Sequence, residues 1–469
     1  MRFPLALMPA ARGAAVTRAA IASTVFAGAA VGIIAAAAEC GAQSDTGAAR
    51  SAAAVAIHAG RLIDVDHGTV LTDQLITITG DRVTRVESWT TAGHHAPPGA
   101  TLIDLSAYTV APGLIDCHTH LADFDESQDV LDPLEHSEAQ VAFQGVRNAR
   151  ATLLAGFTTV RDVGTYRAFT DVALRDAIDD GTVPGPRMEV AGAYVTTTSG
   201  GGEVTGMAPD VTLPQTFRMG VADTPDEARA RVRVILHNGA NFIKVIATGA
   251  VLTAGTNPGA TEMSDDMLRA IVQEAAKYGT FVAAHAHGAD GIKAAVRAGV
   301  RSIEHGSLMD DEAIALMHDH GTYLVADIYN GDYIAEYGKR HDWHAEIMRK
   351  NDETTLAQRE GFRKAVTAGV KIAFGTDAGV YPHGLNARQL PYMVRWGMTP
   401  MQALQSATIE AARLMRWDDR VGSIAPGKFA DLVAVTGDGL GDLSAYEHVA
   451  FVMKGGRVVK TPDQVRAAP

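Results

Sequence analysis

The sequence contains little cysteine and no excess of positive charge. Its 469 residues include two cysteines, Cys40 and Cys117, and 41 Lys and Arg against 54 Asp and Glu, a formal net charge of -13. A nucleic-acid-binding surface needs basic residues that neutralise phosphates, so this balance argues against a nucleic-acid partner. If Cys40 is removed or lipidated, no intramolecular disulfide can form, and a large hydrophobic core must stabilise the chain.

The N-terminus is almost free of charge. The charged side chains of the first 38 residues are Arg2, Arg12 and Arg18. An alanine-rich apolar run occupies residues 21–38. A basic start, an apolar stretch and small residues are typical of an export signal, which we expect over residues 1–42 with cleavage near Ala42. A small polar segment, residues 43–54, follows as a linker.

Two other interpretations of the N-terminus stay open. The apolar run is close to the length that spans a membrane, although its alanine content makes it a weak span. Cys40 stands where a lipid-anchored cysteine could stand, but Glu39 does not suit the position before it. We therefore expect an exported protein that is periplasmic or secreted, with lipid anchoring at Cys40 as the alternative.

The two ends of the remaining chain share a β-type pattern. Residues 55–111 contain short runs of β-forming residues, with Gly80-Asp81 as a turn between two of them, and no stretch of helical periodicity. The same pattern returns in residues 416–469. Both segments flank a long middle region, so the sequence predicts one small β-sandwich domain assembled from both ends.

The middle region, residues 112–415, alternates strands and helices. Its apolar β-type runs are Gly113–Cys117, Thr158–Arg161, Met188–Tyr194, Phe242–Ile246, Thr280–Ala284, Ser302–Glu304, Tyr323–Ala326 and Lys371–Phe374. Helical stretches between them include Asp265–Tyr278, Ala289–Ala298 and Asp311–His320. Eight such repeats predict an α/β fold, a (β/α)8 barrel of the TIM type. A doubly wound sheet is the alternative, but polar residues gather at the strand ends, where barrel enzymes keep their active sites.

Histidines at one strand end indicate a metal site. His118 and His120 lie two positions apart at the end of the first run, so their side chains point to the same side of the strand. Cys117 then points the other way, into the packing of the barrel. A lone His-x-His pair is weak evidence for a metal.

Further candidate ligands stand at the ends of other strands. Lys244 lies within an otherwise apolar strand, where a bare ammonium group is costly. A salt bridge or a snorkelling lysine would explain it, and so would a lysine carbamylated by CO2. His285, His305 and Asp377 each follow a separate strand. Imidazole and carboxylate ligands suit Zn2+ foremost, with Mn, Co or Fe as alternatives.

Taken together, these motifs resemble the amidohydrolase superfamily of the binuclear type. The matching segments are 111–116 before His118, then Lys244, His285, 303–306, 375–379, and the return segments 422–424 and 426–432. The resemblance implies that His118, His120 and Asp377 hold one metal, that His285 and His305 hold the other, and that carbamylated Lys244 bridges them. In His285-Ala286-His287, the family pattern places the ligand first, so we expect His287 in substrate binding or beside the ligands.

This site implies a hydrolytic mechanism. A hydroxide between two cations is nucleophilic at neutral pH, and one cation polarises the scissile carbonyl group. Asp377 accepts the proton of the water and passes it to the leaving amine.

Within the superfamily, segments 244–249, 262–264 and 300–306 resemble imidazolonepropionase-like or Xaa-Pro dipeptidase members, which are metal-dependent carboxypeptidases and dipeptidases. Segments 327–330 and 381–384 resemble amidohydrolases that degrade ochratoxin A. Both resemblances imply cleavage of an amide bond to a C-terminal amino acid, in a dipeptide or an N-acyl amino acid. True imidazolonepropionases are mononuclear and lack the bridging lysine, so Lys244 argues against that activity and against deamination.

A substrate carboxylate requires cationic or hydrogen-bonding partners. Candidates are His287, His383 and Arg161, and Tyr329 is a candidate donor to the carbonyl oxygen of the reaction centre. For Arg161, an internal ion pair with Asp162 is the alternative to binding of the substrate carboxylate. Residues 196–224 follow the third strand and are expected to cover the site as a mobile loop.

Two other functions are compatible with such a barrel. A lactonase, esterase or phosphotriesterase can use the same pair of metals on an ester, and a panel of esters and amides separates these activities. A non-catalytic binding relative would be expected to lack ligands, and all six are present here. The resemblance also implies a homo-oligomer, an octamer in the nearest relatives, that acts on a small molecule.

Overall fold

The computed structural model describes residues 54–123, 132–208 and 210–462. The expected export signal and nearly all of the expected linker lie outside the described residues. Within those residues, no helix has the length and the apolar character needed to cross a membrane.

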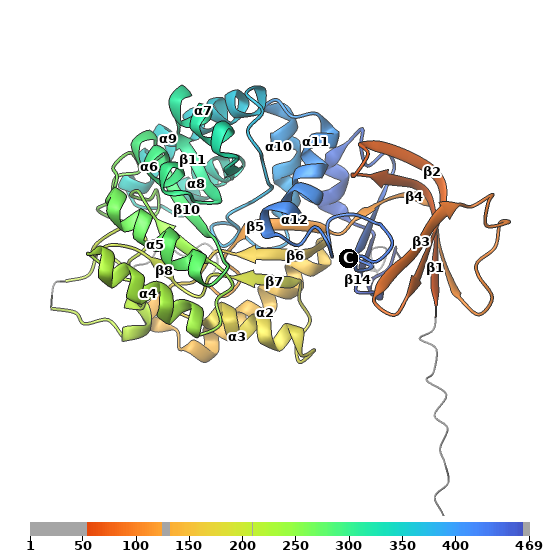
Figure 1. The fold of residues 1–469 in the computed structure, drawn as a ribbon, viewed down its shortest axis with the longest axis horizontal. Helices are drawn as coiled ribbons and strands as arrows, with labels where there is room; N and C mark the ends of the chain where they lie inside the picture. Colours follow the sequence, from red (N-terminus) through yellow and green to blue (C-terminus); the bar gives the residue numbers. More distant parts are fainter. Residues whose placement is uncertain (1–53, 124–131, 209, 463–469) are drawn as a thin grey trace, which may run out of the picture. The chain divides into compact units, whose positions relative to one another are not determined.

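Strands from both ends of the chain form a seven-stranded sheet. Its members are β1 (Val55–Asp64), β2 (Thr69–Thr79), β3 (Arg82–Ser88), β4 (Thr101–Pro112), β13 (Leu432–Thr436), β14 (Phe451–Lys454) and β15 (Arg457–Lys460). They follow the order β15-β14-β13-β4-β1-β2-β3. β13 pairs antiparallel with β4, which joins the C-terminal strands to the N-terminal ones (Figure 1).

We expected a sandwich of two sheets in this region, whereas the hydrogen bonds join all seven strands in one. β1 and β4 are long, and their register shifts between Ala59 and Arg61, a type of irregularity that increases the twist of a sheet. Buried side chains of both chain ends, including Ile57, Ile76 and Phe451, form a separate hydrophobic core for this sheet.

The middle of the chain contains parallel strands. They are β5 (Leu114–Thr119), β6 (Phe157–Asp162), β7 (Arg187–Val190), β8 (Tyr194–Val195), β9 (Ile243–Ile246), β10 (Val282–Gly288), β11 (Ser302–Leu308) and β12 (Tyr323–Val325). β5, β6 and β7 form one sheet, and β8 to β12 form another. Residues 371–374 connect the two sheets, because Leu324 N donates to Lys371 O and Cys117 N donates to Phe374 O, each at 2.8 Å.

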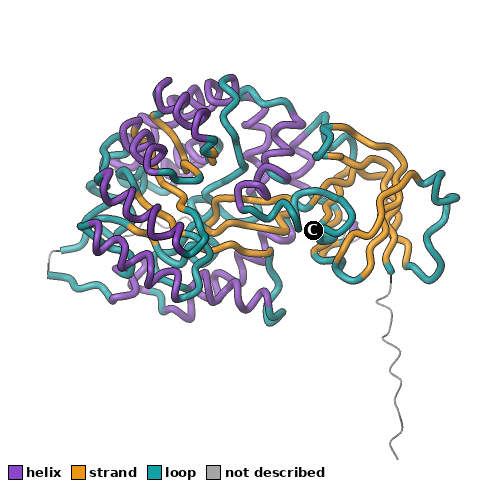
Figure 2. Tube along the Cα trace, viewed as in Figure 1, coloured by secondary structure: helices purple, strands orange, loops and turns teal. Residues whose placement is uncertain are grey.

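Helices surround these parallel strands (Figure 2). They are α1 (Asp132–Glu135), α2 (Glu138–Leu154), α3 (Thr170–Asp179), α4 (Pro225–His237), α5 (Asp265–Lys277), α6 (Ala289–Ala298), α7 (Asp311–His320), α8 (Asn330–Arg340), α9 (Ala345–Thr367), α10 (Gln389–Arg395), α11 (Pro400–Ser406) and α12 (Ile409–Met415), with 3-10 turns η1 (Gln215–Arg218), η2 (Asn386–Arg388) and η3 (Leu443–His448). Local sequence sets their ends: Ser264 caps α5 by accepting from Met267 N, and α6 ends at Gly299, whose φ is 97°.

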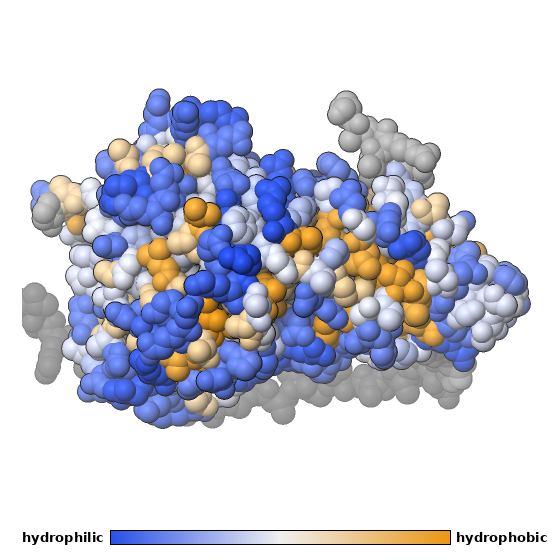
Figure 3. Space-filling view, turned by 90° about the horizontal axis from the view of Figure 1, so that it is seen from above, coloured by the Kyte–Doolittle hydropathy of each residue, from blue (hydrophilic) through white to orange (hydrophobic). Residues whose placement is uncertain are grey.

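The largest hydrophobic core lies between the parallel strands and the helices. It contains side chains from most of these strands, such as Val245, Ile303 and Leu324. Cys117 is buried in a neighbouring cluster with Ile115 and Val421, so its side chain faces packed residues as the strand alternation predicts. Hydrophilic residues occupy much of the face in Figure 3, with hydrophobic residues in patches between them.

Candidate metal centre

The candidate ligands converge on one cavity of about 550 Å³ at the carboxyl ends of the parallel strands. They come from β5, β9, β10 and β11 and from the turn after residues 371–374. The cavity-lining members are His118, His120, Lys244, His285, His287, His305 and Asp377. Because parallel strands end at the same edge, residues far apart in the sequence meet here.

One group of metal-binding atoms consists of two imidazoles and a carboxylate. Asp377 Oδ1 lies 3.3 Å from His118 Nε2 and 3.2 Å from His120 Nε2. The three ligand atoms lie within 4.8 Å of one another, so a single cation could contact all of them.

Buried hydrogen bonds orient the two histidines. His118 Nδ1 lies 2.9 Å from Glu304 Oε2, and His120 Nδ1 lies 2.8 Å from Gly164 O. Both partners are acceptors, so Nδ1 carries the proton and Nε2 presents its lone pair to the cavity. Tyr194 Oη lies 3.0 Å from His120 Nδ1 and also donates to Gly164 O at 3.1 Å.

Glu304 is itself held by fully buried partners. Arg161 Nη2 donates to Glu304 Oε1 at 2.7 Å, and Ser302 Oγ donates to the same oxygen. Burial raises the pKa of the Glu304 carboxyl, but Arg161 and His118 outweigh this effect and hold the pKa well below its ordinary value. Glu304 therefore remains a carboxylate that can accept from His118.

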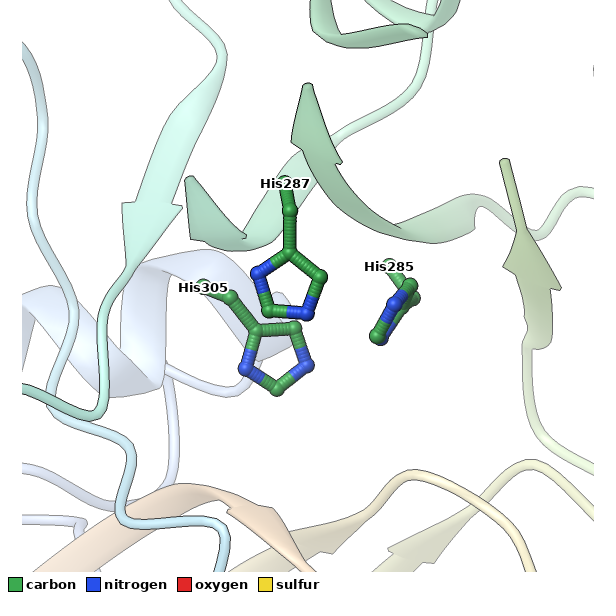
Figure 4. Close-up of side chains that lie close together, drawn as sticks. All are labelled: His285, His287 and His305. Atoms are coloured by element: carbon green, nitrogen blue, oxygen red, sulfur yellow. The ribbon is translucent and has the colours of Figure 1, made fainter. Parts of the chain in front are cut away.

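Three further imidazoles form the second group (Figure 4). The ligand atoms of His285, His287 and His305 lie within 4.8 Å of one another, and the rings of His287 and His305 are stacked with centroids 4.8 Å apart. His287 Nδ1 lies 2.8 Å from Ser307 Oγ. The sequence predicts His287 in substrate binding or beside the ligands; in the structure it lines the cavity, and its ligand atom lies within 4.8 Å of those of His285 and His305.

Asp327 and Asn330 connect the two groups. His305 Nδ1 lies 3.0 Å from Asp327 Oδ1, to which Gln358 Nε2 also donates at 2.8 Å. Asn330 Nδ2 donates to Asp327 Oδ2 and to Asp377 Oδ2, each at 3.0 Å. The ligand atoms of His305, Asp327 and Asp377 again lie within 4.8 Å of one another, so the two groups adjoin.

Lys244 lies beside both groups. Its side chain is 2% exposed, and burial lowers the pKa of its amine to about 8, although Glu304 and Asp377 act in the opposite direction. Burial is the largest influence that lowers the pKa values of His118 and His285, and the positive charge of Lys244 lowers both further. His118 belongs to the first ligand group and His285 to the second. A buried amine of lowered pKa has a neutral fraction that can react with CO2.

The backbone is strained at two candidate ligands. His305 and Asp377 have φ values of 67° and 58°, in the left-handed region that non-glycine residues rarely adopt. Asp377 is held there because its N–H donates to His118 O at 2.8 Å. The buried Asp116 carboxylate fixes the same turn by accepting from Thr376 Oγ1 at 2.6 Å and from Asn386 Nδ2 at 2.7 Å. Such strain is typical of functional sites.

Comparison with known proteins agrees with this geometry. Residues 109–461 match the model of the amidohydrolase family. The chain belongs to the amidohydrolase family. Ochratoxinase of Aspergillus niger is 31% identical over 441 residues, which cover 87% of this chain and 86% of that protein. A Xaa-Pro dipeptidase structure with methionine bound in its active site is 39% identical, with a TM-score of 0.80, over 87% of this chain and all of that one.

A prolidase structure with bound N-methylphosphonate-L-proline is 31% identical, with a TM-score of 0.80, and covers 87% of this chain. The amidohydrolase described here is therefore a hydrolase that acts on amide or peptide bonds. Its donor set fits divalent cations, since imidazoles with fixed lone pairs and carboxylates are the usual ligands of such ions in hydrolases.

Three predicted substrate contacts of this amidohydrolase do not line the cavity. Arg161 is buried in the protein interior, where it binds Glu304 and, through Nε, the Cys117 carbonyl oxygen at 2.7 Å. Its partners are therefore neither a substrate nor Asp162, because successive residues of β6 face opposite sides and the side chain of Arg161 turns toward the protein interior.

Tyr329 and His383 are also outside the set of residues that line the cavity. Tyr329 Oη accepts from Arg388 Nη1 at 3.1 Å, and its ring packs on Tyr381. His383 Nε2 lies 3.3 Å from the backbone oxygen of His120. Neither side chain is among the cavity-lining residues, so the geometry does not support an oxyanion role for Tyr329 or a substrate role for His383.

Sequence reasoning gave no role to several residues at the site. Glu304 and Asp327 orient ligand histidines, and Tyr194 and Arg167 line the cavity. Glu304 lies within β11, directly before the candidate ligand His305, and Asp327 follows β12, but neither position distinguishes these carboxylates from ordinary polar residues in the sequence. The expected loop, residues 196–224, does contribute Gly201 to Gly206 and Phe217 to the cavity wall.

Proposed function

We propose that this amidohydrolase cleaves the amide bond to a C-terminal amino acid, in a dipeptide or an N-acyl amino acid, with ochratoxin A as one substrate to test. The observation that carries the proposal is the pair of adjoining ligand groups, three imidazoles on one side and two imidazoles with Asp377 on the other, in one cavity. Relatives named for a dipeptidase, a prolidase and an ochratoxinase support an amide bond of this type.

The ligand assignment belongs to the same proposal. His118, His120 and Asp377 would hold one cation, His285 and His305 would hold the other, and Lys244, as its carbamate, would contribute an anionic ligand to both. Zn2+ is the expected metal. The parallel segments, β5 to β12 and residues 371–374, would close as a TIM-type barrel around this site, which the hydrogen bonds of residues 371–374 to both neighbouring strands support.

The cations would supply Lewis acidity toward a carbonyl oxygen and would lower the pKa of water. The chain itself moves the proton. Asp377 would accept a proton from the attacking water at a carboxylate oxygen and deliver it to the leaving amine nitrogen. Asn330, which donates to Asp377 Oδ2 at 3.0 Å, fixes the orientation of that carboxylate.

The decisive experiment combines metal analysis with a hydrolysis panel. Purified protein is expected to contain close to two divalent metal ions per chain and to release the C-terminal residue from some N-acyl amino acids or dipeptides of a panel that includes ochratoxin A. Lys244→Ala should lose most of the second metal and the activity. Incubation with isotope-labelled bicarbonate should label wild-type protein and leave Lys244→Ala unlabelled. Lys454→Ala is the control for losing a lysine, because Lys454 is half-buried on β14 of the seven-stranded sheet.

Other results would redirect the proposal. One metal ion per chain, with full activity in Lys244→Ala, would contradict the bridging role of the lysine. Hydrolysis confined to esters would contradict the amide substrate and favour a lactonase or esterase, while the family assignment would stand.

A further inference from the structure

An apolar part of the cavity wall has no task in the proposed mechanism. Four side chains pack together in one cluster and also line the cavity; these four, called the apolar patch below, are Leu252, Ile334, Ile347 and Val380. The last three are at most 9% exposed, and Leu252 is partly buried against them. Separate segments of the chain thus combine to form one apolar surface that faces the cavity.

The apolar patch adjoins the metal centre. Val380 N donates to Asp377 O at 3.1 Å, within the turn that carries the proposed proton acceptor. Ile334 lies four residues after Asn330 on α8, so the two side chains share one face of the helix. Asn330 in turn donates to the Asp377 carboxylate. A substituent next to an amide bond held at the metal centre is therefore positioned to contact the patch.

A buried lysine of α9 holds the loop that carries Leu252. Lys350 Nζ donates to Ala250 O at 3.4 Å and to Thr253 O at 2.8 Å. These two carbonyl groups stand on either side of Leu252 in the chain. Glu346 Oε1 lies 2.7 Å from the same Nζ. The three donors of the buried ammonium group thus have three acceptors, which fixes the loop on the patch.

The same loop is bound from its other side. Thr253 Oγ1 donates to Gly201 O at 2.7 Å, and Thr205 Oγ1 donates to Ala254 O at 2.9 Å, so residues 201–206 of the cavity wall are attached to it. Gly255 N donates to Glu346 Oε1 at 3.1 Å. The patch is therefore preformed, and a substrate that binds there does not have to order the loop.

We propose that the apolar patch is a subsite that binds an apolar substituent of the substrate next to the scissile amide. This inference rests on the proposed function. The substituent is either the side chain of the C-terminal amino acid or part of the acyl group. The four aliphatic side chains offer no hydrogen bond to a polar atom, so the subsite selects an apolar substituent over a polar one of the same size. Lys350 is a positioning residue, because it acts through Leu252.

The test uses substrates that differ in one side chain. Leucine and its polar isostere asparagine are compared at the C-terminal position and, in a second series, on the acyl side of the best substrate of the panel. The variants are Leu252→Asn, Val380→Thr and Lys350→Met. Leu356→Asn is the matched control, because Leu356 lies on α9, is 63% exposed and is outside the cavity wall.

The measured quantity is the ratio of kcat/KM for leucine to kcat/KM for asparagine. This ratio does not depend on the fraction of active enzyme, so a merely structural loss leaves it unchanged. Metal content and the melting temperature are also measured for every variant.

Wild type should prefer leucine by at least about tenfold in one of the two series, which identifies the side of the amide bond that the patch serves. In that series, Leu252→Asn and Val380→Thr should each lower the preference by about 3- to 10-fold, mainly through KM for the leucine substrate. Lys350→Met should lower it as well. Adding Lys350→Met to Leu252→Asn should change it less than about twofold further, because both act through one side chain. Leu356→Asn should keep the wild-type preference.

No preference for leucine in either series would overturn the subsite, and so would a preference that Leu252→Asn leaves unchanged. If Leu252→Asn does not fold, Val380→Thr decides in the same way. If Lys350→Met does not fold, Glu346→Gln replaces it, since it weakens an acceptor of the same ammonium group, and an unchanged preference there would contradict the positioning role of Lys350. A wild-type enzyme that cleaves no amide of the panel would instead refute the proposed function.

Discussion

Arg161 allows the sharpest test of how the protein interior supports the site. Its side chain and that of Glu304 are both 0% exposed, and Nη2 lies 2.7 Å from Oε1. Arg161→Met removes the cation and leaves the Glu304 carboxylate in a dry environment without its counter-charge. Breaking one side of a buried ion pair costs about 3–5 kcal/mol, so we expect the free energy of unfolding to fall by about that amount.

A double substitution tests the cause. Arg161→Met/Glu304→Leu removes both charges, and an apolar replacement of a buried pair is often close to neutral. The double variant should therefore be more stable than Arg161→Met alone. It should also bind metal more weakly, by about 10- to 100-fold, because His118 loses the acceptor that orients its ring.

Urea titration of metal-free protein, followed by circular dichroism, measures the unfolding free energies without a contribution from bound metal. A loss below about 1 kcal/mol in Arg161→Met would refute the account of the buried pair. So would a double variant whose loss equals the sum of the two single variants. If Arg161→Met remained stable and lost activity on free acids but not on their C-terminal carboxamides, Arg161 would bind the substrate, which would contradict its place in the protein interior.

Three further outcomes are expected. Burial raises the pKa of Glu189 to about 8, so its protonated form favours folding and stability is lost as pH rises from about 5 through 8; the charged groups that act on it are Arg161, Arg301, Arg416 and Arg420. The difference in unfolding free energy between Glu189→Gln and wild type should therefore shift in favour of the variant by on the order of 2–4 kcal/mol from pH 5 to pH 8. Identical pH profiles of stability for the two proteins would contradict this. In Gly375→Ala, the added Cβ would lie 2.2 Å from Val325 Cγ1 and 2.9 Å from His118 Cβ, so the free energy of unfolding should fall by about 1–3 kcal/mol and metal binding should weaken. Gly259→Ala is the control, because its added Cβ would have no atom nearer than 3.5 Å. Equal melting temperatures and metal contents in the two variants would contradict the prediction. Export should yield a chain that begins near residue 43, which N-terminal sequencing of the secreted or periplasmic protein checks; an intact Met1 would contradict the signal.

Local signals predicted the elements of the middle region well. The expected helices over 289–298 and 311–320 begin and end where α6 and α7 do, because Gly299 and Gly321 provide left-handed C-caps. The β-type runs at both chain ends were also recognisable, but their arrangement was not. Whether strands form one sheet or two depends on long-range pairing, here of β4 with β13, and on a bulge near Gly60 that alternation of side chains does not reveal.

The candidate ligands were predictable for a different reason than their surroundings. His118, His120 and Lys244 have a residue type and a strand position that together indicate chemistry. The partners that fix them do not: Glu304, Asp327 and Asn330 could equally have been ordinary polar residues in the sequence. Their roles follow from distances across separate strands, such as 2.9 Å from Glu304 to His118, which depend on how the strands are staggered.

Arg161 and Arg167 show why substrate contacts were the least predictable part of the site. Arg161 lies within β6 and Arg167 lies six residues later, in the segment that leaves it. The sequence indicates Arg161 as a candidate substrate contact and assigns no role to Arg167. In the structure, the alternation of β6 turns Arg161 into the interior toward Glu304, whereas the chain beyond the strand is free to bring Arg167 to the cavity wall. A charge inside the strand is therefore used for internal pairing here, and a charge just beyond the strand lies at the cavity wall. The same division at β10 and β11 predicts that His287 and Ser307 affect metal affinity more than substrate preference. Ser307→Ala should therefore bind metal more weakly and keep the same order of preference among the substrates of the panel.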